Sequence, residues 1–136
     1  RIGGLVNGSD ASFRVESVVS LAPGNTGGPV SSSPAIVSLS AGAVRTYLYP
    51  IFDPDFDPVN CRFASNTEAG FSPAIPSVPS GGAMPTVMAA SGGCLLTWDL
   101  TRATSGQRFV VPLILSSTRA GVTSTSPLDM IVENRG

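Results

Sequence analysis

The stretch Cys94-Leu95-Leu96-Thr97-Trp98-Asp99 decides the fold more than any other part of the chain. It is mostly apolar and contains no glycine or proline, as expected for a short strand. Successive side chains of a strand point to opposite faces, so Cys94, Leu96 and Trp98 would share one face. We therefore expect Trp98 to pack in the core beside the cysteine. An exposed tryptophan that serves as a sugar-binding platform is the alternative.

Similar apolar blocks recur along the chain, about ten to fifteen residues apart outside one long gap, which is typical of a β-sandwich. Besides Cys94–Trp98 they are Ala35–Leu39, Val44–Phe52, Val59–Ala64, Phe109–Leu115 and Leu128–Val132. A further predicted strand, Phe13–Leu21, precedes them. The 15 glycines and 12 prolines interrupt every long apolar stripe of helical period. We predict an all-β fold, a β-sandwich with little helix and with an N-terminal extension strand.

Two segments are rich in turn-forming residues. Residues 22–34 contain three prolines and three glycines, and residues 69–93 contain four prolines and five glycines. This density predicts that 22–34 has no regular structure and separates an N-terminal strand and linker (1–28) from the sandwich (29–136). Residues 69–93 are predicted to form a long loop with at most one short strand.

Composition excludes several classes of function. All eight basic residues are arginines, nine residues are acidic and histidine is absent, which gives a formal net charge of −1. Binding to nucleic acid needs clustered positive charge, so we expect no nucleic-acid partner. The longest apolar stretch, Phe109–Leu115, has seven residues, whereas a membrane span needs about twenty. We therefore expect no membrane insertion.

No set of residues suitable for catalysis emerges from the sequence. Arg1-Ile2-Gly3-Gly4 and Gly24–Pro29 (GNTGGP) resemble two motifs of trypsin-like proteases. Such an enzyme needs a histidine base, which the chain lacks, and Thr26 stands at the nucleophile position. The three closely spaced aspartates share one segment rather than facing each other across a cleft. We expect that the protein is not an enzyme.

The two cysteines, Cys61 and Cys94, bound a loop of 34 residues counted inclusively. We expect a disulfide between them, which would stabilise the fold by roughly 3 to 4 kcal/mol. A pair of buried free thiols is the alternative. We expect no zinc site at the cysteines. Zinc needs four ligands, typically cysteine or histidine at short spacings, and the chain has two distant cysteines and no histidine.

The remaining composition indicates a secreted or cell-surface protein. The chain has no lysine, is rich in serine, threonine and proline, and carries the sequon Asn7-Gly8-Ser9. Asn7 is therefore a predicted N-glycan site. Ser31–Pro34, Ser72–Pro79 and Thr123–Pro127 are candidate O-glycan segments.

The segment Asp53-Pro54-Asp55-Phe56-Asp57-Pro58 is the strongest candidate for a binding site. Three carboxylates at alternating positions can direct oxygen ligands at a hard cation, so Asp53, Asp55 and Asp57 are candidate calcium ligands. The alternative, which we favour from sequence alone, is a solvated turn whose aspartates accept hydrogen bonds from neighbouring amides. Further acidic candidates are Asp10, Glu16, Glu68, Asp99, Asp129 and Glu133.

The predicted strand at residues 13–21 precedes the linker and suggests a mode of assembly. Its apolar residues Phe13, Val15, Val18 and Val19 are candidates for donation to a neighbouring subunit, because an added strand pairs with an exposed sheet edge. An ordinary first strand of the same sandwich is the equal alternative.

The cysteine-bearing segments Asn60–Ala64 and Cys94–Trp98, with a core tryptophan beside the bridge, resemble the immunoglobulin-like sandwiches of extracellular proteins. The acidic turn is similar in character to the inter-domain calcium linkers of cadherin-like repeats. The resemblance covers roughly residues 29–134 and implies a sandwich domain in an adhesive, matrix or fibre-forming protein.

These features together predict a structural extracellular protein. We expect a subunit or repeat of an adhesive or filamentous assembly, built through strand-mediated head-to-tail contacts, with copies of itself or neighbouring domains as partners. The alternative is an extracellular module that binds a carbohydrate or protein ligand through the 69–93 loop.

Overall fold

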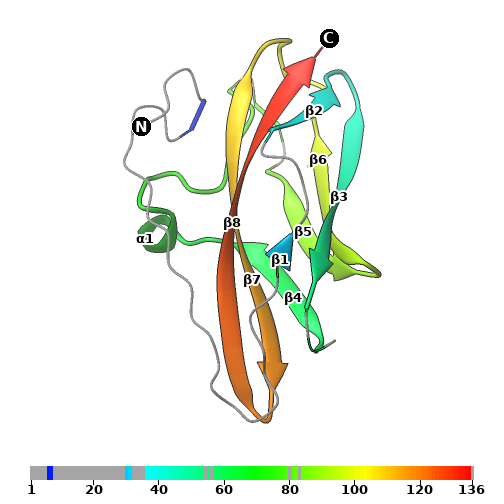
Figure 1. Ribbon diagram of the computed structural model, residues 1–136. Coiled ribbons are helices and arrows are strands. Elements are labelled where there is room, and N and C mark those ends of the chain that lie inside the picture. Colours follow the sequence, from blue (N-terminus) through cyan, green and yellow to red (C-terminus); the bar gives the residue numbers. More distant parts are fainter. Residues whose placement is uncertain are drawn as a thin grey trace.

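The computed structural model describes residues 6–7, 30–31, 36–53, 55, 57–79, 81–82 and 84–135. The described part contains eight strands and one short helix. They are β1 (Val30–Ser31), β2 (Ile36–Ser40), β3 (Val44–Phe52), β4 (Val59–Phe63), α1 (Asn66–Ala69), β5 (Thr86–Ala90), β6 (Gly93–Asp99), β7 (Arg108–Arg119) and β8 (Val122–Arg135). The strands form two sheets in the orders β1-β3-β6-β5 and β2-β8-β7-β4 (Figure 1). The predicted all-β fold with little helix is confirmed.

Most strands lie where the apolar blocks predict them. β3 coincides with the predicted block, and β5 is the one short strand in residues 69–93. The expectation that residues 22–34 lack regular structure is wrong at β1, whose Val30 and Ser31 pair with Phe52 and Ile51 of β3. A neighbouring strand that offers hydrogen bonds overrides a weak local preference.

The β7–β8 hairpin extends well beyond its two predicted blocks. Pairing between the two strands continues through the polar end of the hairpin, from Ser116↔Thr125 to Arg119↔Val122. The hairpin closes through Ala120 and Gly121, which both have positive φ, at 52° and 76°. A two-residue turn of this kind matches the natural twist of paired strands.

The main core lies between the two sheets. Along β6, Cys94, Leu96 and Trp98 are at most 1% exposed, so the predicted alternation is confirmed. Trp98 packs edge-to-face on Phe109 of β7, with ring centroids 4.8 Å apart. The tryptophan is a core residue, and the alternative of an exposed sugar-binding platform is wrong. Other core members come from both sheets and include Tyr49, Val111, Leu113, Met130 and Val132.

The Cys61–Cys94 disulfide joins the two sheets. Cys61 lies on β4 and Cys94 on β6, and their Cα atoms are 6.2 Å apart. The predicted disulfide is confirmed and the alternative of free thiols is wrong. The bridge fixes one side of the sandwich covalently.

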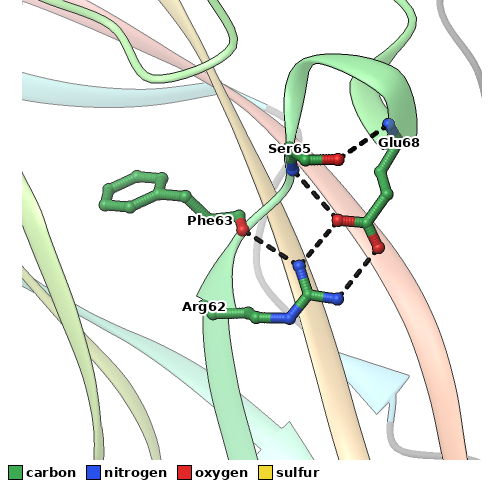
Figure 2. A network of polar contacts seen from close by, with 4 residues as sticks. All are labelled: Arg62, Phe63, Ser65 and Glu68. Atoms are coloured by element: carbon green, nitrogen blue, oxygen red, sulfur yellow. Dashed lines mark hydrogen bonds and ion pairs between the residues drawn. The ribbon is translucent and has the colours of Figure 1, made fainter.

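Helix α1 is short but strongly capped. The Ser65 hydroxyl accepts a hydrogen bond from the Glu68 amide, and a Glu68 carboxylate oxygen accepts one from the Ser65 amide. Arg62 donates from both terminal nitrogens to the same carboxylate, at 2.7 and 2.9 Å (Figure 2). The hydrogen bonds from Arg62 and from the Ser65 amide lower the pKa of Glu68 to about 2.

The capped helix begins a covering layer over the outer face of the β2-β8-β7-β4 sheet, on the side away from β3 and β6 (Figure 1). The layer packs on the sheet in a second apolar cluster. Ala64, Ala69, Phe71 and Ala74 come from the layer, and Val110 and Ile114 come from β7. Among the residues described, no helix has the length and apolar character to cross a membrane.

Candidate functional site

The acidic loop between β3 and β4 brings the three predicted aspartates together. One carboxylate oxygen from each of Asp53, Asp55 and Asp57 lies within 4.8 Å of the others. The loop follows Phe52 and crosses from one sheet to the other before Val59. The three candidate calcium ligands named from the sequence therefore lie close together in the folded chain.

Asp53 is the buried member of the acidic loop, with only 5% of its surface exposed. Its Oδ1 accepts hydrogen bonds from the backbone amides of Asp55, at 2.9 Å, and Asp57, at 3.2 Å. The turn expected from sequence is thus present, with Asp53 as its cap. The other oxygen, Oδ2, is buried and has no hydrogen-bond partner.

Arg119, at the end of β7, is the partner of the acidic loop that sequence did not reveal. Its Nε lies 3.1 Å from Asp57 Oδ2, and its Nη2 donates to the backbone oxygen of Asp55 at 3.1 Å. The guanidinium ties the β3–β4 crossing to the β7–β8 hairpin. The partners are 62 and 64 positions apart, so only the folded topology brings them together.

Other acidic candidates have separate roles in the part of the chain that the structure describes. Glu68 pairs with Arg62, and Glu133 pairs with both Arg108 and Arg135. Hydrogen bonds from the Thr101 hydroxyl and amide lower the pKa of Asp99. Asp129 lies on β8, and Asp10 and Glu16 are outside the described residues.

Asn7, the sequon asparagine, is 3% exposed. Its Nδ2 donates to the backbone oxygens of Val110, at 2.9 Å, and Ala74, at 3.3 Å, while its Oδ1 accepts from the Val110 amide at 2.9 Å. N-glycosylation requires an accessible side-chain nitrogen, whereas the folded chain buries this one and uses it as a donor twice. The sequence did not reveal this structural role, and a glycan at Asn7 stays a prediction.

The N-terminal assembly residues Phe13, Val15, Val18 and Val19 lie outside the described residues. The two described residues of the 1–28 segment, Val6 and Asn7, contact the sandwich. Strand donation by residues 13–21 stays a prediction.

The outer face of the β1-β3-β6-β5 sheet is a second feature with functional potential. Four large apolar side chains on it are more than 40% exposed: Val44, Leu48, Phe52 and Met88. The strand register aligns Leu48 and Met88 on either side of Leu95 in one row. Thr46, Thr97 and Thr86 form the next row.

Charge is almost absent from this apolar face. Among the outward positions of β3, β5 and β6 that the structure describes, Asp99 at one end is the only charged residue. The outer face of the opposite sheet, by contrast, is covered by the layer that begins at α1. An apolar sheet face without charge is typical of an interaction surface.

Comparisons of the chain with known protein families, with characterised proteins and with solved structures find no match. Its function must therefore be inferred from its own residues.

Proposed function

We propose that this chain is a structural domain of a secreted or cell-surface protein, and that two copies associate through the outer face of the β1-β3-β6-β5 sheet. The disulfide supports an oxidising compartment, where such bridges persist. The exposed apolar side chains of Val44, Leu48 and Met88 on this face are the observation that carries the proposed association.

Strand order supports an immunoglobulin-like type of sandwich. The orders β1-β3-β6-β5 and β4-β7-β8 correspond to the A-B-E-D and C-F-G sheets of that fold, with β2 added in parallel to β8. Immunoglobulin domains place their bridge between strands B and F and their core tryptophan on C. Here the bridge joins β4 to β6 and Trp98 lies on β6, so the proposed likeness concerns topology rather than the core motif.

The size of the apolar face is sufficient for a weak, specific dimer. Its exposed apolar side chains, with Leu95 and the threonine row, present on the order of 500 Å². Two copies packed face to face would bury about 1,000 Å² in total, which is near the lower limit for a specific interface. The near absence of charge on the face removes repulsion between identical copies.

Face-to-face pairing is a closed contact and by itself produces a dimer. A filament needs a second contact, for which strand exchange through residues 13–21 is the hypothesis.

The 69–93 loop is less suited to ligand binding than its composition indicates. Phe71 and Ala74 are buried in the second apolar cluster, and Val78 belongs to the main core. These anchors favour a structural role for the loop over a ligand-binding one.

The proposed dimer is tested by sedimentation equilibrium over a wide concentration range. We expect the unmodified chain to dimerise, and Leu48→Glu with Met88→Glu to remain monomeric because four charges would be buried at each interface. Val122→Glu, which replaces a side chain 48% exposed on the β7–β8 hairpin, is the matched control and should dimerise normally. A chain that is monomeric at all concentrations would overturn the proposal.

A further inference from the structure

We propose that the loop between β3 and β4 binds a calcium ion through the carboxylates of Asp53, Asp55 and Asp57. This site is independent of the proposed pairing face. Two oxygens bound to one Ca²⁺ at about 2.3 to 2.6 Å can be no more than about 5 Å apart. The three carboxylate oxygens already satisfy this limit, since all lie within 4.8 Å of one another.

The unpartnered oxygen of Asp53 is the observation that distinguishes this site from an ordinary acidic turn. Only 5% of the Asp53 surface is exposed, and its buried Oδ2 accepts no hydrogen bond. A carboxylate oxygen removed from water and left without a partner is costly. Arg119 does not supply the missing partner, because it contacts Asp57 and the backbone of Asp55. A bound cation would supply it.

The donors of the site suit a hard divalent ion, because all three are carboxylate oxygens. Arg119 engages Oδ2 of Asp57 and leaves the second oxygen of that carboxylate for the ion. The donor set consists of oxygens on one loop, which suits Ca²⁺ and its flexible coordination better than Mg²⁺, which demands near-ideal octahedral geometry.

An ion held at this point would act on the crossing between the sheets. Asp53 directly follows β3, and Asp57 is two residues before β4. Coordination by both would fix the crossing relative to the end of β7, where Arg119 already holds it.

The experiment is a calorimetric titration of the folded, chelator-treated chain with calcium chloride, accompanied by thermal melts. We expect one saturable site with a Kd of roughly 10⁻⁴ to 10⁻³ M, the range of extracellular calcium modules, and a higher Tm at about 10 mM Ca²⁺. Magnesium at the same concentration should raise the Tm less. An equal effect of the two ions would overturn the assignment to calcium.

Variants separate specific binding from general attraction to acidic residues. Asp55→Asn should weaken binding at least about tenfold, since one ligand charge is lost. Asp99→Asn is the matched control, because that carboxylate bonds to Thr101 outside the loop and its loss should leave the Kd unchanged. Asp53→Asn, with folding verified by circular dichroism, should also weaken binding. Unchanged affinity in Asp55→Asn, or no heat and no Tm shift in the unmodified chain, would refute the site.

Discussion

The side-chain amide of Asn7 pairs with the backbone of Val110 in the way that a neighbouring strand would. It accepts from the Val110 amide and donates to the Val110 carbonyl, both at 2.9 Å. β4 pairs with β7 only as far as Leu113, and the Ala64 amide bonds to Pro112. Asn7 therefore supplies hydrogen bonds to the edge of β7 beyond the end of β4. An edge satisfied in this way cannot pair with another chain.

Replacing Asn7 by alanine should be strongly destabilising. Asn7→Ala removes three hydrogen bonds and leaves buried backbone groups of Val110 and Ala74 unpaired. We expect a loss of about 2 to 3 kcal/mol in the free energy of unfolding, measured with urea. Asn60→Ala, at an exposed position of β4, is the control and should cost less than about 0.5 kcal/mol. Similar losses in the two variants would contradict the strand-like role of Asn7.

Gly93 is a position in β6 that has no room for a side chain. A Cβ atom added there would collide with the backbone carbonyl of Tyr49 on the paired strand β3. Gly93→Ala should cost more than about 2 kcal/mol, because backbone on both strands must shift. Gly82→Ala is the matched control, since its nearest neighbour would be 3.8 Å away. Thermal melts of both variants provide the comparison, and an unchanged Tm for Gly93→Ala would disprove the close approach.

Reduction of the disulfide should lower stability without abolishing the β-structure. The bridge closes a loop between residues 33 positions apart, which corresponds to about 3 to 4 kcal/mol in the chain-entropy model. The measurement is urea unfolding with and without a reducing agent. The double variant Cys61→Ser with Cys94→Ser should be less stable and insensitive to the reductant. A reductant effect that persists in this variant would show that the bridge is not its cause.

The ion pair between Arg62 and Glu68 should weaken in acid. Glu68 has a pKa of about 2 in the folded chain instead of 4.5, so its contribution is complete above pH 4.5 and is lost as the pH falls toward 2. Both side chains are more than a third exposed, so screening limits the pair to about 0.5 to 1 kcal/mol. A double-mutant cycle with Arg62→Gln and Glu68→Gln should give this coupling at pH 7 and only a small part of it near pH 2. Coupling that is independent of pH would contradict the assignment.

Sequence patterns predict the parts of the fold that depend on local periodicity. The bounds of β3, the buried face of β6 and the partner of Cys61 all follow from residue order and composition. The length of the β7–β8 hairpin does not, because its tip is polar and its turn residues, Ala120 and Gly121, lack the usual asparagine or aspartate.

Sequence likewise predicts one part of the candidate site and misses another. The convergence of Asp53, Asp55 and Asp57 follows from their spacing in one short loop. The contribution of Arg119 depends on the hairpin that returns it to the loop, and the burial of Asn7 depends on where β4 ends. Such long-range contacts leave no periodic pattern in the chain.

The bridge between β4 and β6 also determines how far the domain can lengthen under tension. Pulling force entering at Cys61 passes through the sulfurs to Cys94 without stretching the 33 peptide units between them. Those units would add about 100 Å when fully extended. When its sheets separate, the oxidised domain therefore stays shorter than the reduced domain by about 100 Å, and only reduction releases that length.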